Sequence, residues 1–155
     1  MMIGMIAALA AGWAPSGQET PAASTAPSAS SASATVDRLS IAIGETVVVR
    51  LGEGGRGFVL VSRVREDPVG EVPADSIRFS FGSVAGQSML SVENGYGRAF
   101  EYRARMFLGR RSATTSTCTV LPGMPTFESW PHPIERLELS RAALLTGRVE
   151  GIRCR

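Results

Sequence analysis

Hydrophobic and polar residues alternate with a period of two along much of the chain beyond residue 36, which is typical of β-strands. The clearest cases are Ile77–Phe81 and Phe100–Met106, where every second residue is apolar and the residues between are charged or Ser. Glu45–Leu51 and Phe58–Arg65 are rich in Val, and β-branched residues favour strands. The one segment suited to a helical turn, Arg141–Leu145, is short and reads equally well as the start of a strand.

Turn residues separate these segments at short intervals. Asn94-Gly95-Tyr96-Gly97 lies between Gln87–Glu93 and Arg98–Phe107, and Asn and Gly tolerate the positive φ of tight turns, so we expect a hairpin here. Leu121–Pro133 contains four prolines and is expected to be irregular. Further strands are predicted at Val36–Ile43, Ser112–Val120 and Ile134–Leu139.

Seven to nine short strands without helical crossovers predict an all-β fold. The expected architecture is an antiparallel β-sandwich, either immunoglobulin-like or jelly-roll-like, over residues 36–155.

The residues before this domain have a different composition. Residues 1–14 are uncharged and mostly apolar, with the small-x-small pattern Ala8-Leu9-Ala10 that signal peptidase accepts. No Arg or Lys precedes the apolar run, so a misplaced start codon is an open alternative. A spanning helix needs about 20 residues, so no stable membrane span is expected. Residues 15–35 are rich in Ala, Ser, Pro and Thr, which predicts a disordered linker.

Two cysteines, Cys118 and Cys154, lie in the predicted domain. Together with the N-terminal segment they predict a disulfide in an oxidising compartment, hence a periplasmic or secreted protein. The alternative is two unrelated buried thiols. His132 is the only histidine, which makes a zinc site a poor interpretation, and no metal or other cofactor is expected.

The net charge of the chain argues against some classes of partner. All sixteen basic residues are arginine and the formal net charge is +2, which is too low for a typical nucleic-acid binder, so no nucleic-acid partner is expected. Arg110-Arg111 beside Arg103 and Arg105 would suit an anionic surface or a phosphate. The competing interpretation, which we favour, is a charged outer face that keeps the sheet soluble.

Two loops resemble ligand-binding motifs. Gly52–Gly57 matches the spacing G-x-G-x-x-G, but a strand-like segment follows where a dinucleotide site needs a helix, so a hairpin connection is predicted instead. Glu66, Asp67, Glu71 and Asp75 lack the ligand alternation of an EF-hand, and a solvated acidic loop is the preferred interpretation.

His132 is the sole candidate for a histidine general base. It lies between Pro131 and Pro133, and no G-x-S-x-G nucleophile motif accompanies it, so a structural or surface role is favoured.

The proline-rich segment is the predicted partner-binding loop, because Met124, Phe127, Trp130 and His132 concentrate apolar and aromatic bulk on a stiff stretch. The alternative, which we favour, is that these side chains fold back and cap the sandwich, with Trp130 plugging the edge of the core.

Two functions of different class remain. The favoured hypothesis is an exported, non-catalytic binding or structural module of the cell envelope, a class that includes small secreted inhibitors, with an envelope protein as one candidate partner. The alternative is a hydrolase in which His132 acts with a Ser or Asp from another loop.

Overall fold

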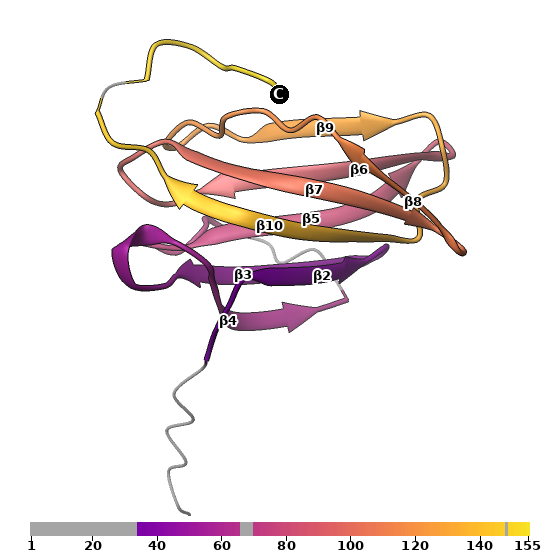
Figure 1. Ribbon diagram of the computed structural model, residues 1–155, viewed down its shortest axis with the longest axis horizontal. Helices are drawn as coiled ribbons and strands as arrows, with labels where there is room; N and C mark the ends of the chain where they lie inside the picture. Colours follow the sequence, from indigo (N-terminus) through magenta and orange to yellow (C-terminus); the bar gives the residue numbers. More distant parts are fainter. Residues whose placement is uncertain (1–33, 66–69, 148) are drawn as a thin grey trace, which may run out of the picture. The chain divides into compact units, whose positions relative to one another are not determined.

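A computed structural model of the chain describes residues 34–65, 70–147 and 149–155. The predicted apolar segment 1–14, nearly all of the predicted linker 15–35, and Glu66 and Asp67 lie outside these residues. The described chain is an all-β sandwich of two antiparallel sheets (Figure 1), so the predicted fold class is confirmed.

The two sheets contain ten strands, slightly more than expected. In spatial order, the larger sheet contains β1 (Thr35–Val36), β4 (Phe58–Val64), β3 (Glu45–Leu51), β5 (Ile77–Val84), β6 (Gln87–Asn94) and β9 (Thr126–Trp130). The smaller sheet contains β2 (Arg38–Ala42), β10 (Arg136–Leu144), β7 (Phe100–Leu108) and β8 (Arg111–Thr115). The one helix within the described residues is a 3₁₀ turn, Glu53–Gly55.

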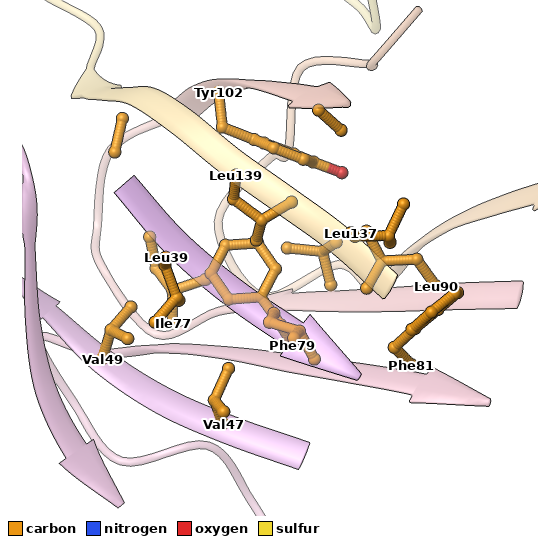
Figure 2. Packing of buried hydrophobic residues seen from close by; sticks show 14 of the residues in the cluster. Leu39, Val47, Val49, Ile77, Phe79, Phe81, Leu90, Tyr102, Leu137 and Leu139 are labelled. Atoms are coloured by element: carbon orange, nitrogen blue, oxygen red, sulfur yellow. The ribbon is translucent and has the colours of Figure 1, made fainter. Parts of the chain in front are cut away.

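The core lies between the sheets, where the apolar residues of the alternating strands meet (Figure 2). Phe79 of β5 packs edge-to-face against Phe58, Phe100 and Tyr102. Alternation places every second residue of a strand on the same face, and the predicted inward residues are buried on β5 (Ile77, Phe79 and Phe81) and on β7 (Phe100, Tyr102 and Ala104). Met106, the last of the predicted set on β7, is only partly buried and packs against the core.

The predicted hairpin at Asn94-Gly95 is wrong. Strand β6 pairs with β5 and β9, whereas β7 lies in the other sheet, so the segment 95–99 crosses between the sheets. The Asn94 side chain is buried and acts as an internal link. Its Nδ2 donates hydrogen bonds to the carbonyl oxygens of Arg98 (2.8 Å) and Val120 (3.2 Å), and its Oδ1 accepts one from the Tyr96 N–H (3.0 Å).

Gly95 is required for a close approach and does not adopt a positive φ. A Cβ at this position would clash with the Pro73 carbonyl oxygen. Tertiary contacts therefore require Asn and Gly at these two positions. This explains why the pair does not mark a hairpin turn here, as it usually does.

The tight hairpin of this region joins β5 to β6 instead. Val84 pairs with Gln87, so Ala85 and Gly86 form a two-residue loop, and both have positive φ (51° and 81°). Positive φ at both positions is the conformation of a type I′ turn, whose twist matches that of paired strands. The predicted connection at Gly52–Gly57 is confirmed, since Leu51 pairs with Phe58 across it.

Two further expectations need correction. Leu121–Pro133 is not irregular throughout, because Thr126–Trp130 forms the edge strand β9 and pairs with β6. The predicted first strand, Val36–Ile43, is split at Asp37 into β1 and β2, which join different sheets. Both errors have one cause, since pairing to a distant strand is not visible in local composition.

The segment Arg141–Leu145 belongs largely to β10 and interrupts its regular pairing. The register with β7 shifts between Ser140 and Ala143, and Arg141 has a positive φ of 53°. This β-bulge inserts an extra residue and redirects the side chains around it.

The last residues of the chain return to the segment that follows β8. Cys154 forms a disulfide with Cys118, as predicted. Main-chain hydrogen bonds on both sides of the bridge join Thr117 to Arg155 and Thr119 to Arg153. The disulfide therefore holds residues 153–155 beside the four-stranded sheet.

Candidate functional site

The outer face of the four-stranded sheet carries a group of arginines in register. Ser140 on β10 pairs with Arg38 on β2 and with Arg103 on β7. In the next row of this face, Glu138 pairs with Arg105. Paired residues share a face of the sheet, and Arg38 and Arg103 are two strands apart, so their Cα atoms are about 10 Å from each other.

A shallow groove of about 650 Å³ lies on this face. Five of its lining residues are arginines and one is an acid, Glu138: the arginines are Arg38, Arg103, Arg105, Arg141 and Arg155. The hydroxyl-bearing lining residues are Thr114, Thr115, Ser116 and Ser140. An anion would therefore meet both guanidinium groups and neutral hydrogen-bond donors.

Three of the five arginines already have partners. Arg38 Nη1 lies 3.3 Å from Glu138 Oε1, and Arg155 Nη2 lies 3.1 Å from Glu101 Oε1. Arg103 Nη1 donates a hydrogen bond to the main-chain oxygen of Arg155 at 3.1 Å. Exposed ion pairs contribute only about 0.2–1 kcal/mol, so a ligand competes with them at small cost.

The other two arginines have no such partner. Arg105 and Arg141 are exposed, and within the described parts of the chain neither side chain forms a hydrogen bond or an ion pair. Arg141 follows Ser140, which lines the groove, so strict alternation would turn its side chain toward the core. The bulge and the positive φ of Arg141 bring it to the groove instead.

The predicted catalytic candidate stands apart from this groove. His132 is exposed, and its imidazole has no hydrogen-bond partner in residues 34–65, 70–147 and 149–155. The nearby Ser88 hydroxyl is occupied, since it donates to the His132 carbonyl oxygen (2.8 Å) and accepts from the Ile134 N–H (2.7 Å). No Ser or Asp of the described chain is therefore hydrogen-bonded to this imidazole.

The predicted partner-binding residues take different positions around β9. Met124 and Phe127 are exposed, by 53% and 61%. Trp130 is partly buried, packs against the core, and donates a hydrogen bond from Nε1 to Thr115 Oγ1 at 2.8 Å. Capping of the core thus applies to Trp130, while Met124 and Phe127 remain available at the surface, and their role in binding stays a prediction.

One buried polar cluster was not anticipated from the sequence. Glu128 of β9 points inward, where its Oε1 accepts hydrogen bonds from the Tyr102 hydroxyl (2.8 Å) and the Cys118 N–H (3.0 Å). Its Oε2 is buried and has no hydrogen-bond partner in the described residues. Burial raises the pKa of Glu128 above its ordinary value despite both hydrogen bonds, and burial likewise raises the pKa of Tyr102, with a further contribution from the nearby Glu128 carboxylate.

The sequence indicated only part of the arginine group. Of the four arginines that would suit an anion according to the sequence, Arg103 and Arg105 line the groove. Arg110 and Arg111 are at the β7–β8 turn and do not line it. Arg38, Arg141 and Arg155 come from distant segments. The alternating pattern of β2 and β7 indicates that their arginines face outward. No local pattern indicates that the bulge brings Arg141 to the groove or that the C-terminal segment brings Arg155 there.

Comparison with protein-family models, curated proteins and solved structures found no match to this chain. Among the described residues, no helix is long and apolar enough to cross a bilayer, and no three His, Cys, Asp or Glu side chains gather in a way that would hold a metal ion.

Proposed function

We propose that this protein is a non-catalytic binding module of the cell envelope, and that it binds an anionic ligand in the arginine groove. The observation that carries the proposal is the pair Arg105 and Arg141, two exposed guanidinium groups that have no partner among the described residues and lie beside three further arginines. Unsatisfied cationic groups around one hollow favour anions through charge and through directed N–H donors.

The backbone at Arg141 supports a role beyond solubility. A non-glycine residue in the left-handed region costs about 1–2 kcal/mol, and strain of this kind often accompanies binding sites. Glycine would remove that cost, so the presence of Arg at φ 53° is understandable if its guanidinium is used.

The envelope assignment rests on separate features. A disulfide persists in oxidising compartments, and Cys118 and Cys154 are bonded. The N-terminal sequence has the features of a signal segment followed by a linker that would give the domain reach. When the full chain is expressed in a bacterial host, we expect it in the periplasm or medium with its N-terminus removed near Ala10. An intact N-terminus on cytoplasmic protein would contradict export.

Co-sedimentation with isolated envelope fragments tests the binding function. The double variant Arg105→Gln/Arg141→Gly should bind about tenfold more weakly than the wild type, because two charge-assisted contacts are lost. It should also unfold at no lower urea concentration, since glycine relieves the backbone at position 141.

The matched control is Arg50→Gln/Arg110→Gln, which removes the same charge from exposed positions outside the groove. Its binding should stay close to that of the wild type. Equal losses in the two double variants would mean that only net charge matters, and wild-type protein that stays in the supernatant would refute the proposal.

A further inference from the structure

We infer that the ligand of the arginine groove is an anionic polysaccharide that lies across the outer face of the four-stranded sheet. This inference rests on the proposed binding function and adds the chemical class and the extended form of the ligand. Three features support it, namely the length of the cationic track, the mixture of groups along it, and its position on a face of the sheet.

The cationic track is longer than a single anion requires. A second hollow, of about 530 Å³, adjoins the groove and shares Arg38, Ser140 and Arg141 with it. It extends along the last part of β10 to Arg56, which pairs with Ala143, and Asp37 also lines it. Arginines from Arg105 to Arg56 thus line two adjoining hollows, an arrangement that suits a chain with repeated charges.

The groups along this track suit a sugar chain with spaced acidic groups. Glu138 lies among the arginines of the groove and would repel an unbroken row of phosphates, as in a nucleic acid. The hydroxyl-bearing residues Thr114, Ser116 and Ser140 line the same groove as the arginines and can hydrogen-bond to the hydroxyls of a sugar. The acidic groups of the ligand would be carboxylates or sulfates, both of which fit the guanidinium fork.

Other macromolecules fit the track less well. None of the residues that line the two hollows is aromatic, and the Phe107 ring on the same face is covered by the Arg136 guanidinium at 3.7 Å. Single-stranded nucleic acids need aromatic surfaces for base stacking. Extended peptides commonly pair with the edge of a sheet, whereas this track crosses a face.

Titration with labelled oligogalacturonates, from the disaccharide to the octasaccharide, tests the inference, with dextran sulfate as the sulfate-bearing counterpart and neutral malto-oligosaccharides as the uncharged one. We expect affinity to rise with chain length for the oligogalacturonates, and no binding of the neutral chains. Tighter binding of dextran sulfate than of oligogalacturonate would assign sulfate as the acidic group within the same class.

Substitution at the far end of the track adds a test of the extended form. Arg56→Gln should weaken binding of the octasaccharide about fivefold, the effect of losing one exposed charge contact, and leave the disaccharide unchanged. Arg50→Gln is the matched control and should change neither. Urea unfolding of each variant shows whether its fold is intact.

Four outcomes would overturn the inference, three of them patterns of affinity and the fourth a lack of binding. Affinity independent of chain length would indicate a single-anion site, tighter binding of polyglutamate would indicate an acidic protein partner, and tighter binding of single-stranded DNA would indicate a nucleic acid. If no polysaccharide binds while Arg105→Gln/Arg141→Gly still impairs sedimentation with envelope fragments, the ligand class is wrong and the binding function stands. If both measurements fail, the proposed function fails with it.

Discussion

At the scale of single residues, the Glu128 carboxylate is in an unfavourable environment, because burying a charged group without full pairing costs free energy. It is buried, one of its oxygens has no partner among the described residues, and burial raises its pKa. In the folded protein the protonated form is therefore favoured relative to the unfolded chain, where the pKa is close to the ordinary 4.5. Stability from this group is fully present below about pH 4.5 and is lost as the pH rises through the raised pKa.

The variant Glu128→Gln should remove this pH dependence. Its amide oxygen still accepts from the Tyr102 hydroxyl and the Cys118 N–H, but it has no proton to lose. We expect the melting temperature of the variant, relative to that of the wild type, to increase as the pH is raised from 4 to 8. Calorimetry at several pH values measures this difference. A difference that does not change with pH would show that Glu128 has the same pKa in both states.

At the scale of elements, the connection between β6 and β7 depends on the Asn94 side chain. A two-residue hairpin turn would need only the backbone of Asn94, whereas the observed crossover uses three hydrogen bonds of its amide. A glycine at position 94 would be compatible with a hairpin turn, but it would lack the amide that the crossover uses. Substitution therefore distinguishes a local turn from a tertiary link.

Both Asn94→Ala and Asn94→Gly should destabilise the protein by about 1–3 kcal/mol, because buried backbone groups lose their partners. The two values should be similar, and urea unfolding at neutral pH measures them. Gly86→Ala serves as a contrast, since Gly86 has a positive φ of 81° in a true two-residue turn with nothing near its Cβ position. Its cost should come from the backbone alone, about 1 kcal/mol. Toleration of Asn94→Gly would contradict the tertiary role.

At the scale of the whole molecule, the disulfide affects both the stability of the protein and the candidate site. It holds the C-terminal segment against residues 117–119, and this placement brings Arg155 to the groove, where it contacts Glu101 and Arg103. The bridge also closes a loop with a sequence separation of 36 residues, which restricts the unfolded chain.

Replacing both cysteines, as Cys118→Ala/Cys154→Ala, should lower the free energy of unfolding by about 2–4 kcal/mol. It should also weaken binding to envelope fragments by a few-fold, because one of the five arginines is no longer held at the groove. Denaturant unfolding and co-sedimentation measure the two effects. Reduction of the wild type should reproduce both, and two free thiols in unreduced, denatured protein would show that the bridge does not form.

The sequence by itself determined which residues face the core and where most strands lie. Alternation is a local property, because successive side chains of a strand point to opposite sides whatever the strand pairs with. Phe79, Phe81, Phe100 and Tyr102 could therefore be placed inward before any partner was known. The disulfide could also be predicted from the sequence, since the described domain contains two cysteines and each can pair only with the other.

Tertiary structure alone decided which strands pair and which side chains meet. Pairing joins residues far apart in the chain and depends on their combined burial, so composition could not reveal that β6 pairs with β9 or that the Asn94 side chain hydrogen-bonds to Arg98 and Val120. The groove depends on the same non-local choices. Arg38, Arg105 and Arg141 come together only because β10 lies between β2 and β7, and because a bulge, absent from any local pattern, turns Arg141 outward.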